Sequence, residues 1–172
     1  EHYAYIEGCF DVLGGTMGTA VGERVVRAYD RARDLRLPVV VATRSGGARL
    51  QEGMVALAQL ARTASAASRH ARAGLLSLAV YGSPTTGGVY ASYASLVDLR
   101  AAVEHAVIGV AGPRVAEGAL GEPLPPGSHT AEAAYAEGLV DERGDLVEGG
   151  TALREEVAEH GERVDLALPQ VQ

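Results

Sequence analysis

Largely apolar runs of four to six residues alternate along the chain with longer stretches in which apolar residues recur at helical spacing. The runs at residues 39–42 and 75–80 are typical of strands buried on both faces of a sheet. Shorter strands are predicted at residues 3–7, 10–13, 97–103 and 106–110, and helices at 19–36, 50–72, 89–95, 113–119, 131–137 and 149–162. This alternation predicts an α/β domain with a largely parallel sheet.

Each of the two long helices has a face that we expect to point inward. On the first helix this face consists of Val21, Val25, Ala28, Tyr29, Ala32 and Leu35. On the second it consists of Met54, Leu57, Ala58, Ala61, Ser65 and Ser68, and the small residues along it indicate close helix packing. At 172 residues the chain has the length of about one domain. We therefore expect a single domain over residues 1–172, with a C-terminal helix and tail at 148–172.

Composition and charge remove several classes of function. All 15 basic residues are arginine, which rules out Schiff-base chemistry, a pyridoxal lysine and a P-loop lysine. The formal charge of −7 argues against a nucleic-acid binder. No apolar run reaches the roughly 20 residues that span a bilayer, and no signal-peptide pattern opens the chain, so we expect a cytoplasmic protein without membrane attachment. Cys9 is the single cysteine, and no metal site is predicted.

Two glycine pairs, Gly46-Gly47 and Gly87-Gly88, follow the two buried strands, and each precedes a predicted helix. In parallel α/β sheets the chemistry sits at the carboxyl ends of the strands. Glycine lets a ligand approach the backbone closely, and a helix N-terminus offers unpaired N–H groups. Two such turns at neighbouring strand ends predict an oxyanion hole that fits a thioester carbonyl becoming an enolate. A single glycine pair is more often only a tight turn, and the pattern alone does not show that the two pairs meet.

Longer motifs around these glycines carry a resemblance to a known family. They are LGGTMG at residues 13–18, SGGARLQEG at 45–53, PTTGGV at 84–89 and IGVAGPRV at 108–115. In this order and with this spacing they resemble the carboxyltransferase β subunits of acetyl-CoA and acyl-CoA carboxylases, which belong to the crotonase superfamily. The similarity extends from about Phe10 to Asp141.

The resemblance implies a ClpP/crotonase-type spiral of ββα units and a CoA thioester substrate. It implies that backbone N–H groups near Gly47 and Ala48, with those of Gly87 or Gly88, hold the thioester oxygen. In the family, carboxybiotin releases CO2 in the site, the biotin ureido group takes up the α-proton, and the enolate attacks CO2. The implied partners are an α-type carboxyltransferase subunit, a biotin carboxylase and a biotin carrier protein, in a homo- or hetero-oligomer.

The motifs also supply a set of expected substrate-binding residues. They are Gly46, Arg44, Arg49, Thr85, Thr86, Tyr90, Gly15 and Met17. Arg49 is expected to pair with a carboxylate or support its turn rather than touch substrate. Tyr90 is expected to pack along its helix, with a place beside the acyl pocket as the alternative.

The chain departs from the family in four respects. It lacks the four-cysteine zinc ribbon with which bacterial β subunits usually begin, and it starts later in the domain. It does not contain the second half of the carboxyltransferase, which holds biotin. Arg44 stands where a small residue is expected, and Ser83 stands where the family often has aspartate.

Arg44 leaves two interpretations open. It lies beside the first glycine turn, where it is suited to a bidentate contact with a substrate carboxylate or a CoA phosphate. The simpler interpretation is a solvated surface arginine. A carboxylate contact would suit a biotin-independent decarboxylase that breaks down a malonyl-type thioester to the same enolate. A non-catalytic subunit that only helps to assemble a carboxylase is the third alternative beside this decarboxylase and the carboxyltransferase.

Overall fold

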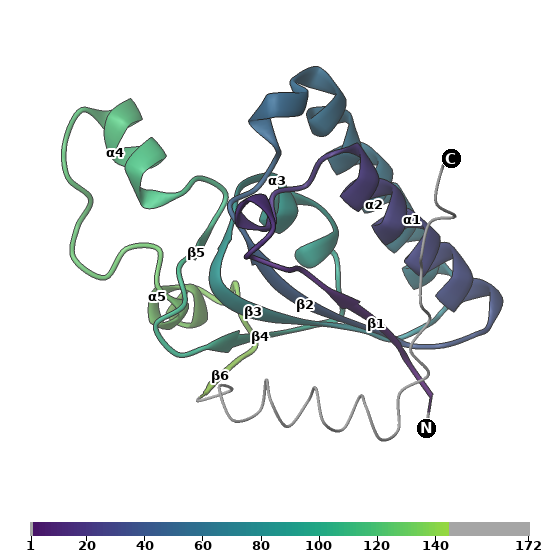
Figure 1. The fold of residues 1–172 in the computed structure, drawn as a ribbon. Helices are drawn as coiled ribbons and strands as arrows, with labels where there is room; N and C mark the ends of the chain where they lie inside the picture. Colours follow the sequence, from purple (N-terminus) through teal and green to yellow (C-terminus); the bar gives the residue numbers. More distant parts are fainter. Residues whose placement is uncertain (1, 145–172) are drawn as a thin grey trace.

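The computed structural model describes residues 2–144, which form an α/β domain around one parallel sheet (Figure 1). The strand order is β1-β2-β3-β4-β6, and β5 pairs with the end of β3. The strands are β1 (Ala4–Glu7), β2 (Val39–Ser45), β3 (Ser77–Thr86), β4 (Leu99–Val103), β5 (Ile108–Gly109) and β6 (Glu142–Gly144). Every one of these pairings is parallel, so the predicted parallel α/β architecture is confirmed.

Two long helices cover one face of the sheet and pack against each other (Figure 1). They are α1 (Thr19–Asp34) and α2 (Met54–Arg72). The shorter helical segments are η1 (Leu13–Gly15), η2 (Leu50–Glu52), α3 (Gly87–Val89), the π-helical turn η3 (Tyr90–Ala94), α4 (Pro113–Leu120) and α5 (Ala131–Ala136). The helix expected at residues 149–162, and the tail with it, lie outside the described residues. No helix in the described range is long and apolar enough to cross a bilayer.

Local structure differs from the sequence prediction at three places. Residues 10–13 form a turn that leads into η1 instead of a strand, because Leu13, Gly14 and Gly15 adopt positive φ angles that break an extended chain. The strand predicted at 75–80 continues as β3 through Thr86, since its polar end pairs with β2 and β5. Strand β6 has no buried residue and therefore carries no apolar pattern from which to predict it.

The predicted inner face is confirmed for α1 and wrong for α2. In α1, Val25, Ala28, Tyr29 and Ala32 are buried as expected, although Leu35 is exposed. In α2 the buried residues are Ala56, Gln59, Thr63, Ala66, Ala67 and His70, whereas Met54 and Leu57 are 77% and 48% exposed. The cause is the close approach of the two helices: a Cβ atom on Gly22 of α1 would lie 2.7 Å from Cγ of Gln59. The inward side of α2 therefore combines alanine with buried polar residues, and Gln59 fits there because Gly22 has no side chain.

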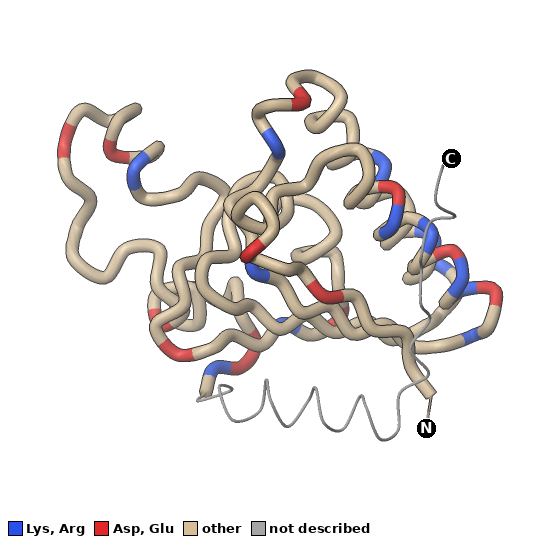
Figure 2. Tube along the Cα trace, viewed as in Figure 1, with Lys and Arg blue, Asp and Glu red and all other residues tan. Residues whose placement is uncertain are grey.

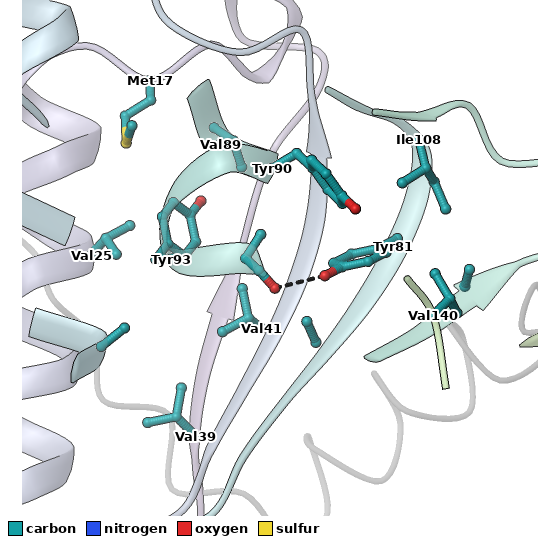
Figure 3. Close-up of a cluster of buried hydrophobic side chains, with 14 of the residues drawn as sticks. Met17, Val25, Val39, Val41, Tyr81, Val89, Tyr90, Tyr93, Ile108 and Val140 are labelled. Carbon is teal, nitrogen blue, oxygen red and sulfur yellow. Dashed lines mark hydrogen bonds between the residues drawn. The ribbon is translucent and has the colours of Figure 1, made fainter. Parts of the chain in front are cut away.

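The core lies between the sheet and these helices (Figure 3). Val39 and Val41 of β2 are fully buried beneath Tyr93 of η3 and Val25 of α1. The Tyr81 hydroxyl of β3 donates a hydrogen bond to the Ala94 carbonyl at 2.9 Å, drawn as the dashed line in Figure 3. This bond fixes η3, and with it the helical segment after the second glycine pair, to the middle of the sheet.

Charged residues lie along both long helices, of both signs on α1 and only basic on α2 (Figure 2). Glu23 of α1 pairs with Arg62 of α2, and Asp30 of α1 pairs with Arg69 of α2 at 3.0 Å. Each of these exposed pairs contributes at most about 1 kcal/mol. Both pairs nevertheless favour one lengthwise register of the helices, because a shift would separate each arginine from its carboxylate.

Candidate functional site

The two glycine pairs lie side by side at the carboxyl ends of β2 and β3. These strands are parallel neighbours, and their register pairs Ser45 with Thr85. Ser45 is the last residue of β2, and Thr85 is the second-last residue of β3. Gly47 has a φ of +105° and Gly87 a φ of +61°, which are angles that residues with a side chain rarely adopt. The topology therefore places both turns at the same edge of the sheet.

The backbones of the two turns are in direct contact. A Cβ atom on Gly47 would lie 3.0 Å from both Gly87 Cα and Gly88 N. A Cβ atom on Gly87 would lie 3.0 Å from Gly47 Cα and 3.3 Å from the Gly46 carbonyl oxygen. No side chain fits at either position without moving the other turn. The two glycine pairs that the sequence singled out thus meet in space.

Most amides of the first turn are used inside the fold. The Gly47 N–H donates to Ser45 Oγ at 3.0 Å, and the Gly46 N–H donates to the Gly14 carbonyl at 3.0 Å. The Arg49 N–H donates to the Met17 carbonyl, also at 3.0 Å. Within residues 2–144 no atom accepts a hydrogen bond from the N–H of Ala48, a half-buried residue. Ala48 therefore carries the amide of this turn that is free to bind an external oxygen.

The second turn offers an amide of the same kind. Gly88 lies in the first turn of α3, where the backbone N–H groups have no intrahelical carbonyl partner. Its nitrogen lies next to the position where a Gly47 side chain would be. The geometry therefore brings the amides of Ala48 and Gly88 to adjoining turns, whereas that of Gly47 is already occupied.

The loop before α1 braces the first turn. The Met17 N–H donates to the Gly47 carbonyl at 2.8 Å. Because the C=O and N–H of a trans peptide point in opposite directions, this bond directs the Ala48 N–H away from Met17. Met17 is fully buried in the core, and a side chain on Gly15 would overlap the Arg44 carbonyl oxygen. In the structure Met17 and Gly15 therefore pack against the first turn and support its shape.

Arg49 and Glu52 hold the first turn through a set of contacts, here called the clamp, that the sequence motif did not predict. Arg49 pairs with Glu52 at 3.2 Å and donates to the Thr16 carbonyl at 2.8 Å, which matches the structural role favoured from the sequence. The Glu52 carboxylate accepts the backbone N–H of Thr19 at 2.6 Å and its hydroxyl at 2.7 Å. The Thr19 amide, with that hydroxyl and Arg49, lowers the pKa of Glu52 from its ordinary value. The clamp ties the first turn to the start of α1.

The remaining expected substrate contacts divide between buried and exposed positions. Thr85 and Thr86 are buried, and their hydroxyls donate to the carbonyls of Thr43 at 2.9 Å and Ser45 at 3.3 Å respectively. Tyr90 is 8% exposed and stacks edge-on against Tyr81 at 5.7 Å between ring centroids. Burial raises the pKa of Tyr90, so its hydroxyl stays protonated.

Arg44 is exposed and held on two sides. Its Nε donates to the Ser83 carbonyl at 3.3 Å, and its guanidinium lies 5.6 Å from the centre of the Phe10 ring. None of the carboxylates at residues 2–144 forms an ion pair with it. Its charge therefore remains available to an anion from outside.

A cavity of about 490 Å³ opens beside the first turn, between β1, β2 and α1. Its apolar wall includes Val21, Val25, Ala28, Val89 and Tyr93, and it is also lined by Thr16 and Ser45 and by Arg24, Arg44 and Arg49. Arg49 is paired with Glu52 and Glu7 also lines the cavity, so the apolar wall is combined with charges of both signs. No group of three or more potential metal-ligating side chains occurs in the described range.

Comparison with known proteins gives a consistent result. The family model described as carboxyl transferase domain matches residues 5–135. The acetyl-coenzyme A carboxylase carboxyl transferase subunit beta of Synechococcus sp. (strain JA-3-3Ab) is 43% identical over 164 residues, which cover 95% of this chain and 52% of that protein. The subunit of the same name from Desulfitobacterium hafniense is 46% identical over 138 residues, covering 80% of this chain and 45% of that protein. The chain thus spans about half the length of these relatives.

Solved structures with the same arrangement include the transcarboxylase 12S hexamer with methylmalonyl-coenzyme A and methylmalonic acid bound. Its TM-score is 0.73 at 26% identity, covering 86% of this chain and 29% of that one. The MdcD-MdcE hetero-dimer of Pseudomonas malonate decarboxylase also gives 0.73, at 24% identity over 90% of this chain and 70% of that one. The geranyl-CoA carboxylase beta subunit of P. aeruginosa gives 0.73 at 23% identity, over 89% of this chain and 29% of that one.

Proposed function

The chain belongs to the carboxyl transferase domain family, and from this premise we propose that it is the β-type subunit of an acyl-CoA carboxyltransferase. Its fold is the predicted α/β fold of ClpP/crotonase type. The observation that carries the proposal is the contact between the two glycine turns, with the free Ala48 amide on one and the first-turn Gly88 amide on the other. The curated relatives are named as subunits of acetyl-coenzyme A carboxylase, which supports a CoA thioester as substrate.

In this mechanism the thioester carbonyl oxygen accepts hydrogen bonds from the N–H groups of Ala48 and Gly88. When the α-carbon loses its proton, negative charge builds on that oxygen. Each preorganised donor then stabilises the transition state by about 3 kcal/mol. Both amides are held rigid by the contact of their turns, so they need little reorganisation as the charge develops.

The enolate carbon attacks CO2, which forms the new carbon–carbon bond. Carboxybiotin on its carrier protein would supply that CO2, and the biotin ureido group left after its release would take up the α-proton. This chain contributes the two free amides, which stabilise the negative charge on the thioester oxygen, and the mechanism needs no side-chain nucleophile.

The proposed partners are an α-type carboxyltransferase subunit that holds biotin, a biotin carboxylase and a biotin carrier protein. The curated relatives are each named as one subunit of a carboxylase, which supports a hetero-oligomeric assembly. The single-domain organisation and the cytoplasmic location remain predictions from the sequence.

The test removes one donor and keeps the rest of the turn. Ala48→Pro deletes the free N–H, and Ala48→Ser at the same half-buried position retains it. With the α-type partner added, carboxyl transfer from malonyl-CoA to free biotin is measured. We expect kcat to fall by about 100- to 1,000-fold in Ala48→Pro and by less than about 3-fold in Ala48→Ser. Equal activity of a folded Ala48→Pro variant and the wild type would rule out this amide as a donor.

Arg44 supports a second candidate, a biotin-independent decarboxylase of malonyl-type thioesters. Its exposed guanidinium has no carboxylate partner in the described residues and lines the cavity. Turnover of malonyl-CoA by the purified chain alone would favour this candidate, whereas activity only with partners and biotin favours the carboxyltransferase. Binding of a CoA thioester without either activity would point to an assembly subunit.

A further inference from the structure

Four hydroxyl side chains lie buried between β2 and β3, immediately below the glycine turns. They are Thr43 (2% exposed), Ser45 (2%), Thr85 (0%) and Thr86 (5%). The strand register shifts here, from Thr43 opposite Tyr81 to Ser45 opposite Thr85. A buried hydroxyl costs free energy unless it is hydrogen-bonded, so each of these groups needs a partner within the fold.

The upper pair of hydroxyls connects the two turns. Thr86, the residue before Gly87, donates from Oγ1 to the Ser45 carbonyl at 3.3 Å. Ser45, the residue before Gly46, accepts the Gly47 N–H on its Oγ at 3.0 Å. The chain of contacts therefore runs from the start of the second turn, through Ser45, to the middle of the first.

The lower pair joins the strands one step further from the turns. Thr43 Oγ1 and Thr85 Oγ1 lie 3.0 Å apart, and Thr85 Oγ1 lies 2.8 Å from the Gly82 carbonyl. Neither of these hydroxyls contacts a glycine of the two turns. Loss of this pair would weaken the sheet without acting on the turns directly.

We propose that Ser45 and Thr86 are positioning residues that set the separation and direction of the Ala48 and Gly88 amides. Ser45 binds the Gly47 N–H and so fixes the Gly46–Gly47 peptide. The Met17 N–H binds the Gly47 carbonyl and so fixes the next peptide, which carries the Ala48 N–H. Thr86 holds the second turn to the same Ser45. The role in catalysis rests on the proposed function, whereas the role in geometry does not.

The geometric arm uses the full chain without partners. Amide resonances are recorded by ¹H–¹⁵N spectroscopy for Ser45→Ala, Thr86→Val and Thr63→Val. Thr63 is a matched control, because it is fully buried in α2 and its hydroxyl also donates to a backbone carbonyl, that of Gln59 at 2.8 Å. We expect the Ala48 and Gly88 resonances to move in the first two variants and to stay in the control.

The kinetic arm uses the same variants in the complex with the α-type partner, with malonyl-CoA and free biotin as substrates. Both substitutions should displace the amide donors by a fraction of a hydrogen-bond length. We therefore expect kcat to fall by about 10- to 100-fold for Ser45→Ala and Thr86→Val, with KM changed by less than about 3-fold. Thr86→Ser keeps the hydroxyl and is expected to restore kcat to within about 3-fold of the wild type, as in Thr63→Val.

The two arms separate the two hypotheses. If Ser45→Ala and Thr86→Val leave the Ala48 and Gly88 resonances in place, the positioning role is wrong whatever the activity. If those resonances move and kcat falls only in these variants, the role holds in full. If they move while the wild-type complex shows no carboxyl transfer, the proposed function fails and the geometric role of Ser45 and Thr86 stands. A drop in kcat of the same size in Thr63→Val would reduce the kinetic effect to general destabilisation.

Discussion

At the scale of single residues, the geometry of the site depends more on the space around the backbone than on side-chain chemistry. Gly47 and Gly87 combine positive φ angles with contacts that leave no space for a Cβ atom. Gly46, which belongs to the same motif, has neither restriction, because a Cβ there would meet its nearest atom at 3.7 Å. Neighbouring glycines of one motif therefore differ in what they contribute.

This difference predicts opposite results for two alanine substitutions. Gly47→Ala forces a side chain against Gly87 and requires a strained φ, so we expect a loss of about 1–3 kcal/mol in unfolding free energy. Because the two turns must also separate, kcat for carboxyl transfer should fall by about 100-fold. Gly46→Ala should change stability by less than about 0.5 kcal/mol. Urea denaturation and steady-state kinetics on both variants provide the measurement, and equal tolerance of the two would contradict the contact.

The sequence predicted the site well at the level of its turns and less well at the level of its atoms. The order of strand, glycine pair and helix was sufficient to bring Gly47 and Gly87 to one edge of a parallel sheet. It could not reveal that the Gly47 amide binds Ser45, because that bond depends on the side-chain rotamer of Ser45 within a folded turn. It could not reveal the Glu52–Thr19 hydrogen bond either, because the two residues are 33 positions apart in the chain.

At the scale of elements, α2 shows where apolar periodicity misleads. The sequence analysis placed its larger apolar residues inward, yet the side of α2 that packs inward consists of alanines and polar residues. The buried polar residues Gln59, Thr63 and His70 interrupt any apolar stripe on that side, and Met54 and Leu57 are left exposed. The prediction succeeded for α1 because its inner face carries side chains large enough to give a clear apolar stripe.

Two leucine substitutions distinguish the observed face of α2 from the predicted one. Ala66 is 1% exposed, so Ala66→Leu overfills the core and should cost about 1–3 kcal/mol of unfolding free energy. Ala61 is exposed, so Ala61→Leu should change stability by less than about 0.5 kcal/mol. Denaturant unfolding of the two variants measures both values. The reverse order would favour the face predicted from the sequence.

The π-helical turn η3 depends on one hydrogen bond from the sheet. Tyr81→Phe removes the hydroxyl that donates to Ala94 and leaves a buried carbonyl without this donor. We expect the variant to lose about 0.5–1.5 kcal/mol of unfolding free energy with its aromatic packing against Tyr90 intact. Thermal and urea unfolding measure the loss. A variant as stable as the wild type would show that another donor replaces the hydroxyl.

At the scale of the whole molecule, several carboxylates connect segments that are far apart in the chain. Glu52 binds Thr19, Glu132 binds the His105 backbone, and Asp141 binds Arg100. Hydrogen bonds from these partners lower the pKa of each carboxyl. The net charge of −7 gave no sign of this arrangement, because composition does not say which acids have partners. The fold is therefore more stable when these groups are ionised.

The acid dependence of stability follows from the direction of these shifts. A carboxyl whose pKa is lower in the folded chain than in the unfolded one stabilises the fold above its unfolded pKa, and this contribution disappears as pH falls through the folded value. For Glu52 the ordinary value is 4.5, so its contribution should be complete near neutral pH and decline below about pH 4.5. Glu52→Gln should be less stable than the wild type near pH 7 and approach it in acid, since protonation gives the wild type a neutral side chain too. Glu104→Gln, at an exposed position, is the control and should follow the wild-type curve throughout. Urea unfolding at several pH values between about 7 and about 3.5 measures this convergence, and a difference that stays constant across that range would exclude ionised Glu52 as the source of the stabilisation.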